Sequence, residues 1–195
     1  IIGLPSVFSS DGVIVKNPID ALNEMIHEVD EKSDIVILLF NSSDQDLNKI
    51  YDQEFNIDII IKSNKSATRS SDGGGNIPTF IAGNRGKVLY KFNLSIQDIQ
   101  LPLIDIAWCN NTMKRVSDRL EKMKKGDINV DLEELYANDS TTLNRIENYK
   151  DQIVYAQDLL SNAVNSITFE KIELNKNVFD KPSILKIIDK GKNKI

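Results

Sequence analysis

The sequence predicts an α/β fold in which a parallel β-sheet unit precedes a pair of long antiparallel helices. Two continuous apolar runs, 35–40 and 57–61, are typical of strands buried on both faces. The segment 41–56 between them is polar and carries apolar residues at helical spacing, so the three segments form a βαβ unit. Two apolar stripes with heptad spacing, 109–123 and 142–163, then predict the helical pair.

Composition narrows the classes of function. A chain of 195 residues fits one domain, or one domain with an appendage. Its formal net charge of −5 argues against a nucleic-acid-binding surface, which needs a basic face. Cys109 is the single cysteine and His27 the single histidine, which excludes an internal disulfide, a Cys-rich zinc site and a His-rich dinuclear centre. No apolar run approaches the roughly 18 residues of a membrane span, so we expect no transmembrane segment.

The first helix is expected after two short strands. Apolar residues at 1–4 and 13–15 predict these strands. Asn17 can cap a helix, and Pro18 suits its first position. Apolar residues then recur at steps of 3 and 4, which predicts an amphipathic helix over 18–32.

Two segments after the βαβ unit are expected to form a β-hairpin. Residues 77–82 and 87–94 flank the turn sequence 83–86, Gly-Asn-Arg-Gly. In the second segment apolar and polar residues alternate, which is typical of a strand with one buried and one solvated face. The residues before the hairpin, 62–76, are rich in serine and contain three consecutive glycines. We interpret them as a loop and not as a phosphate cradle, because no helix follows them.

The second half of the chain is expected to be mostly helical. Gly126 follows the first apolar stripe and ends it, so the two helices are joined by a short connection. Residues 167–174 alternate like a strand, and Pro182 opens a short last helix. We therefore divide the chain into a sheet-forming part, 1–97, and a helical hairpin with a strand–helix tail, 98–195.

Five short segments of the sequence occur in the same order as motifs of a known protein family. They are IIGL (1–4), NPIDAL (17–22), SDIVILL (33–39), IDIII (57–61) and PTFIAGNRGKVL (78–89). They resemble IGLT, DPIEAL, ADIVILLSHLG, IDLIIGGHSH and PVVQAGSRGKYLG of the calcineurin-like metallophosphoesterases, in the bacterial 5′-nucleotidase and 2′,3′-cyclic phosphodiesterase family. The resemblance spans about half of the chain and implies a partial metallophosphoesterase-type sheet. It also implies an extracytoplasmic location, periplasmic or at the cell surface, because such relatives are mostly exported.

The metal-binding loops of that family are absent or altered in this sequence. Family members hold two metal ions with Asp, His and Asn side chains from five loops, and the loops with DxH, GDxxD and GNHE motifs have no counterpart here. Asn41 stands where the resemblance places the histidine of SHLG, and Asn64 and Ser66 stand where it places the histidines of GGHSH. An amide or a hydroxyl replaces an imidazole poorly on zinc or manganese. We therefore expect no metal, no cofactor and no catalytic residue.

Three further residues are candidate contacts for an anion or another ligand. Ser42 follows the first buried strand, Lys62 follows the second, and Arg85 lies in the predicted hairpin turn. The carboxyl ends of parallel strands meet at one edge of a sheet, so we expect these side chains to lie near one another. For His27 we favour a solvent-exposed place on the first helix, and for Cys109 a small buried side chain on the helical stripe.

These features favour a non-catalytic function. The chain is predicted to be a degenerate metallophosphoesterase-like module, a pseudoenzyme that binds or scaffolds another protein. The alternative is a C-terminal piece or subunit of a metal-dependent 5′-nucleotidase-type phosphohydrolase, whose metal-ligand half lies on a missing segment or on another chain. A third hypothesis is a small-molecule-binding protein that uses the vestigial cleft.

The predicted sheet also implies a permanent partner. Its two buried strands are apolar on both faces, and the helix at 18–32 covers one face only. The other face requires the helical hairpin, a protein partner, the missing N-terminal half, or a second copy in a homo-oligomer. The residues expected near this contact are Ile59, Ile61, Tyr90 and Phe92. A second docking face, on the helical hairpin, would comprise Leu132, Leu135, Tyr136 and Leu143.

Overall fold

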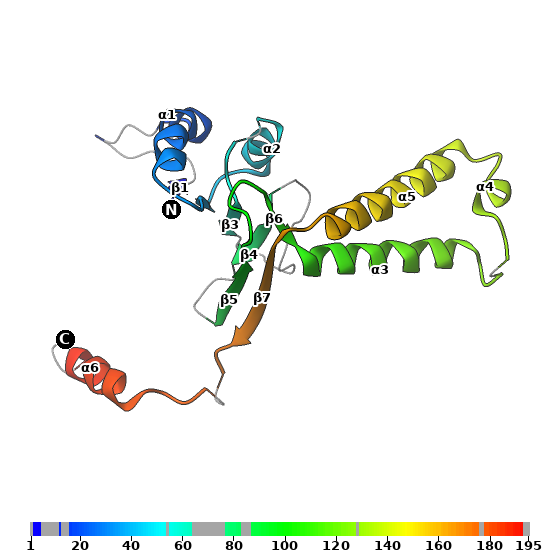
Figure 1. The fold of residues 1–195 in the computed structure, drawn as a ribbon. Helices are drawn as coiled ribbons and strands as arrows, with labels where there is room; N and C mark the ends of the chain where they lie inside the picture. Colours follow the sequence, from blue (N-terminus) through cyan, green and yellow to red (C-terminus); the bar gives the residue numbers. More distant parts are fainter. Residues whose placement is uncertain are drawn as a thin grey trace.

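The computed structural model describes residues 2–4, 12, 16–53, 55–63, 77–82, 87–127, 129–175 and 178–192. Figure 1 shows a body of strands and helices, a long helical arm on one side of it, and a separate C-terminal helix. The elements are, in order, β1 (Ile2–Leu4), α1 (Pro18–Glu31), β2 (Ile37–Phe40), α2 (Asp44–Asp52), β3 (Ile59–Ser63), β4 (Thr79–Ala82), β5 (Val88–Ser95), β6 (Leu103–Asp105), α3 (Ile106–Met123), α4 (Leu132–Leu135), α5 (Ser140–Ser161), β7 (Asn165–Glu173) and α6 (Pro182–Lys192).

A parallel sheet forms the centre of the body, with the strand order β1-β2-β3-β4. β2 and β3 pair from Ile37 opposite Ile59 to Phe40 opposite Lys62, which confirms the predicted βαβ unit and the α/β class. Side chains of α1 and α2 pack together with one face of this sheet in a single apolar cluster. Leu22 of α1 and Ile50 of α2 are completely buried there. Helices α1 and α2 therefore exclude water from this face of the sheet, which explains why the residues of the two runs that point to it are apolar.

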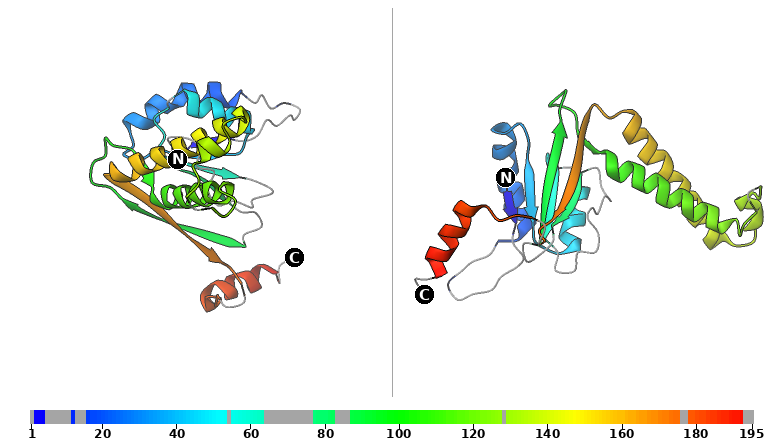
Figure 2. Two further views of the ribbon diagram at one scale, coloured as in Figure 1. Left: turned by 90° about the vertical axis from the view of Figure 1, so that its right-hand side faces the viewer. Right: turned by 90° about the horizontal axis from the view of Figure 1, so that it is seen from below.

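A second sheet packs against the other face of the parallel sheet, over Ile37, β3 and β4, and leaves Leu39 of β2 43% exposed. Its order is β5-β7-β6, with β7 antiparallel to β5 and parallel to β6. Phe80 of β4 lies between the two sheets, with its ring centroid 4.8 Å from that of Phe92 and 5.2 Å from that of Phe169. Figure 2 shows the sheets stacked face to face in its right-hand view. The remaining members of this cluster are Ile37, Ile59, Ile61, Leu103 and Ile167.

This arrangement corrects two predictions about the sheets. The helical hairpin does not cover the second face of the parallel sheet, because the chain supplies a second sheet there. Leu39 of β2 stays 43% exposed on this face, and the partner chain stays a prediction. Ile59, Ile61 and Phe92 therefore belong to an internal core, and Tyr90 lies half-buried beside Phe169. The predicted β-hairpin of 77–82 and 87–94 is also wrong, because β4 pairs with β3 and β5 pairs with β7, in different sheets.

The boundary expected at residue 97 passes through the second sheet. β5, which precedes that boundary, pairs along its whole length with β7, which follows it. The segment 167–174 is a strand as predicted, but it is the central strand of a sheet and not a tail. β6, which was not predicted, has only three residues and is too short to show a period. The strand predicted at 13–15 lies outside the described residues.

The predicted helical hairpin is confirmed as an arm of α3 and α5. The two helices run side by side away from the sheets and carry the short α4 at their tip (Figures 1 and 2). The predicted stripes form their contact, where Cys109, Val116, Ile146 and Ala156 are buried. Gly126, with a φ of 92°, follows the end of α3 and takes a left-handed conformation that suits glycine.

The second apolar face expected on the hairpin is mostly used within the arm. Leu132 of α4 is buried, and the hydroxyl of Tyr136 donates a hydrogen bond to the carbonyl oxygen of Met123 at 3.1 Å. Leu135 is the exposed member of this group, and Leu143 is half-buried. The group closes the tip of the arm because α4 folds back onto the helix ends.

The last helix, α6, begins at Pro182 as predicted but packs on nothing in the described chain. None of its side chains is buried, and Figure 1 shows it beyond the far end of β7. Within the described ranges, no helix combines the length and the apolar character that crossing a bilayer requires.

Candidate functional site

The carboxyl edge of the parallel sheet brings together part of the predicted site. Lys62 of β3 lies opposite Phe40 of β2, and Asn41 and Ser42 directly follow Phe40. These side chains therefore lie at one edge, as predicted from the parallel strands. Asn64, Ser66 and Arg85 lie outside the described residues, as do the three glycines of the preceding loop.

Lys62 is a buried charge at this edge, with only 6% of the residue exposed. It alternates with Ile61 along β3, so it lies on the same face as the completely buried Ile60, under the helices. Its ammonium group donates a hydrogen bond to Oδ1 of Asp44, the first residue of α2. A buried charge is tolerated when it is paired and hydrogen-bonded, and the acidic residue at the helix N-terminus provides this.

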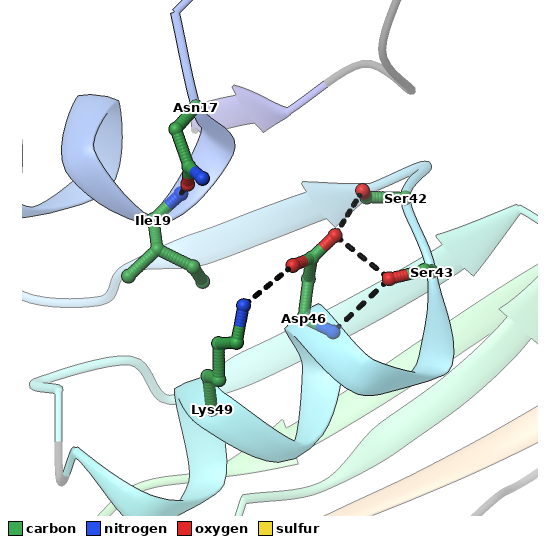
Figure 3. A network of polar contacts seen from close by, with 6 residues as sticks. All are labelled: Asn17, Ile19, Ser42, Ser43, Asp46 and Lys49. Carbon is green, nitrogen blue, oxygen red and sulfur yellow. Dashed lines mark hydrogen bonds and ion pairs between the residues drawn. The ribbon is translucent and has the colours of Figure 1, made fainter.

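Ser42 is held in a network at the start of α2, shown in Figure 3. Its hydroxyl donates to Oδ2 of Asp46 at 2.7 Å, and the hydroxyl of Ser43 donates to the same oxygen at 2.8 Å. Ser43 is the N-cap of α2 and accepts a bond from the backbone N–H of Asp46 at 3.1 Å. The two hydroxyls, with a smaller contribution from Lys49, hold the pKa of Asp46 below its ordinary value. Ser42 therefore stabilises a helix start.

At two other helix starts, a polar side chain also accepts a hydrogen bond from a backbone N–H of the first turn. Figure 3 also shows Asn17, whose Oδ1 accepts a bond from the backbone N–H of Ile19 at 2.9 Å, as predicted for α1. Asp105 is the N-cap of α3 and accepts from the backbone N–H of Trp108 at 2.8 Å. Asp105 is nearly buried, and burial raises its pKa despite its bonds to backbone N–H groups. These polar residues are thus explained by helix formation.

The described residues at the carboxyl edge form neither an activated nucleophile nor a metal site. A serine beside a carboxylate can be activated as a nucleophile, but a carboxylate with a lowered pKa is a weak general base. Asp46 also accepts two further bonds, which hold it in place at the helix start. Among the residues that the structure describes, no group of three or more His, Cys, Asp or Glu side chains is arranged to hold a metal ion.

No family model, no curated protein and no solved structure matches this chain. The relationship to metallophosphoesterases thus remains a prediction.

Two residues that the sequence singled out have structural places. His27 is exposed on α1, and its Nε2 lies 3.7 Å from Oε1 of Glu31 in the next turn. Cys109 is completely buried in the arm. Burial raises the pKa of its thiol, with a further contribution from the charge of Asp105, so the thiol is a poor nucleophile. Both predicted environments are confirmed.

Sequence reasoning missed Asn165, the first residue of β7. It is 1% exposed and joins the strand to the loop between β5 and β6. Its Oδ1 accepts from the backbone N–H groups of Gln97 and Asp98, at 2.8 and 3.1 Å. Its Nδ2 donates to the carbonyl oxygens of Asp98 and Leu101, at 2.5 and 2.6 Å. An asparagine at a strand start gives no signal of such a role, since asparagine is frequent in exposed turns.

Two cavities flank the same loop. One has a volume of about 600 Å³ and lies at the amino edge of the parallel sheet, opposite the predicted site. Asp30, Asp34 and Asp58 line it, but Oδ2 of Asp58 accepts a bond from the backbone N–H of Val36 at 2.7 Å. The other cavity, about 230 Å³, is apolar and lies where the arm joins the second sheet. Neither cavity was predicted, because both depend on the position of residues 99–102.

Proposed function

We propose that this chain is a non-catalytic binding or scaffolding module, a degenerate relative of the calcineurin-like metallophosphoesterases. The observation that carries the proposal is the ion pair of the buried Lys62 with the exposed Asp44 at the carboxyl edge of the parallel sheet. The resemblance places the metal-binding loops at this edge. A lysine ammonium at that position supplies the positive charge that a metal ion supplies in the family.

Electrostatics supports this interpretation. Unit like charges 4 Å apart near a protein surface repel each other by roughly 4 kcal/mol, and a divalent cation doubles that value. The two acidic side chains described at this edge are already bonded: Asp44 accepts from the ammonium of Lys62, and Asp46 accepts from Ser42, Ser43 and Lys49. Asn41 offers a neutral amide in place of an imidazole. The described part of this edge is therefore poorly suited to bind a cation.

The long arm supports a role in binding. α3 and α5 have 18 and 22 residues, which exceeds what is needed to connect β6 to the parallel strand β7. They bury their apolar stripes against each other, and most of their charged residues are exposed. The two helices project away from the sheets (Figure 2). A rigid element that projects from a core is a suitable platform for another protein. By the same resemblance we propose an extracytoplasmic location, to be checked by fractionation of the source cells.

Metal analysis and hydrolysis assays test this proposal directly. The purified chain, incubated with Zn²⁺ or Mn²⁺ and desalted, should retain no stoichiometric metal and should hydrolyse neither nucleotides nor phosphodiester model substrates. Stoichiometric metal that is lost in Asn41→Ala would overturn the proposal. Asn48→Ala is the matched control, because Asn48 is exposed on the neighbouring helix α2 and is not part of the predicted site.

One observation favours the alternative function, a piece or subunit of a metal-dependent phosphohydrolase. Among the described residues, the three-residue β1 is the end strand of the parallel sheet, so one of its edges can accept a further strand. A phosphohydrolase whose metal-ligand half lies on another segment would add its strands there. The reading frame upstream of Ile1 decides between the two functions: DxH and GNHE motifs in it would favour the alternative, and their absence would favour the module.

A further inference from the structure

The C-terminal helix α6 has an apolar face that nothing in the described chain covers. Ile184, Leu185, Ile187 and Ile188 lie at the spacing of one helix face, and each is between 39% and 66% exposed. Phe179, which precedes the helix, is 95% exposed. Single exposed apolar residues are common, but five on one short segment mark an interaction surface.

The same segment is basic in an acidic chain. Residues 178–192 contain four lysines and two aspartates, so the segment carries a net charge of +2. The whole chain carries −5, which leaves −7 on the other residues. This charge difference favours an acidic protein surface as the binding site of α6. It disfavours an anionic membrane, which would repel the rest of the chain.

An uncovered groove on the same molecule has the complementary properties. It is the apolar cavity of about 230 Å³ between the C-terminal end of α5 and the loop before β6. Leu101, Tyr155 and Val164 line it and are each about 40% exposed. Asp158 adds a carboxylate to the lining. An apolar groove with an acidic side chain fits a helix that has an apolar face and carries lysines on its other side.

We propose that α6 of one copy docks into this groove on a second copy, in a reciprocal exchange that gives a closed two-fold dimer. The connection favours a second copy over the groove of the same chain. Val164 lies next to the first residue of β7, whereas α6 follows the last, about 30 Å away along the strand. Residues 174–181 would have to be almost fully extended to span that distance. The backbone N–H of Val178 donates to the carbonyl oxygen of Asn175 at 3.0 Å, which shortens the connection further.

This inference does not rest on the proposed function, because neither α6 nor the groove contains a residue of the predicted site. The first test is the molar mass of the full chain by light scattering across a concentration series. A dimer is expected. Ile187→Asp, on the apolar face of α6, and Tyr155→Asp, in the groove, should each weaken dimerisation about tenfold or more. Leu135→Asp is the matched control, since Leu135 is similarly exposed but lies on α4 at the tip of the arm, and it should leave the dimer unchanged.

Mixing the two variants identifies the contact. The Ile187→Asp chain retains an intact groove, and the Tyr155→Asp chain retains an intact helix. A one-to-one mixture should form a dimer with one of the two contacts, at concentrations where each variant alone is monomeric. A monomeric full chain, or a dimer that both variants leave intact, would overturn the proposal. Binding of the full chain as a monomer to vesicles of phosphatidylserine and phosphatidylcholine would overturn it as well and would assign α6 to a membrane surface.

Discussion

Replacing Asn165 with alanine tests how the second sheet is attached to the loop before β6. The substitution removes four hydrogen bonds that the side chain makes with the backbone of residues 97–101. A typical bond contributes about 1 kcal/mol net, and a buried group left without a partner costs 1–3 kcal/mol. The loop is exposed, so water can reach some of the released groups. We therefore expect the free energy of unfolding to fall by roughly 2–4 kcal/mol.

The measurement is urea denaturation, followed by far-UV circular dichroism and by the fluorescence of the single tryptophan, Trp108. Asn148→Ala is the matched control, because Asn148 is an exposed asparagine on α5 that makes one bond to a backbone carbonyl. Its effect should stay within about 0.5 kcal/mol. Asn165→Asp should also be costly at neutral pH, since a carboxylate cannot donate to the carbonyl oxygens of Asp98 and Leu101. A loss below about 1 kcal/mol for Asn165→Ala would show that water replaces these bonds.

Three other substitutions or modifications test separate parts of the fold. Asp105→Asn keeps the cap of α3 and removes a carboxyl whose pKa is raised by burial. In the wild type, the folded state holds the proton of Asp105 more tightly than the unfolded state does. The wild type should therefore lose stability relative to Asp105→Asn as pH rises from about 4 through the raised pKa. A stability difference that is constant between about pH 4 and 7 would contradict this. Cys109 should react with a thiol reagent only when the arm opens, which a labelling rate that rises steeply with urea would show and rapid labelling in buffer would refute. Leu22→Ala leaves a cavity between α1 and the parallel sheet and should lower the free energy of unfolding by about 2–5 kcal/mol, whereas Met25→Ala on the exposed side of α1 should have little effect in the same denaturation experiment.

The elements that the sequence predicted well are those with a local signal. The buried runs at 35–40 and 57–61 match β2 and β3, and Asn17 with Pro18 fixes the start of α1. The heptad stripes predict the arm, since helices so long must bury a stripe against each other. Each of these signals is contained in neighbouring residues, and tertiary packing only confirms it.

The sheet pairing could not be read in the same way. The Gly-Asn-Arg-Gly sequence indicates a reversal of the chain, but a reversal does not determine which strands pair. β4 is buried on both faces and suits a parallel neighbour, whereas the alternating β5 suits the alternating β7, which follows the entire arm. At the site, Lys62 was correctly placed at the sheet edge, but its bond to Asp44 depends on how α2 packs, which no local pattern specifies.

The position of the arm also affects the order of folding. α3 begins directly after β6, and α5 ends just before β7, so the arm is inserted between two strands that pair with each other. Once its helices have zipped together, the chain between Leu94 and its partner Ile167 becomes effectively about fourfold shorter, which lowers the entropy cost of closing that loop by about 1 kcal/mol. A contact that is distant in sequence thus becomes nearly local, so formation of the arm should speed the pairing of β5 with β7. A nick in the tip of the arm should therefore slow closure of the second sheet without removing any contact within it.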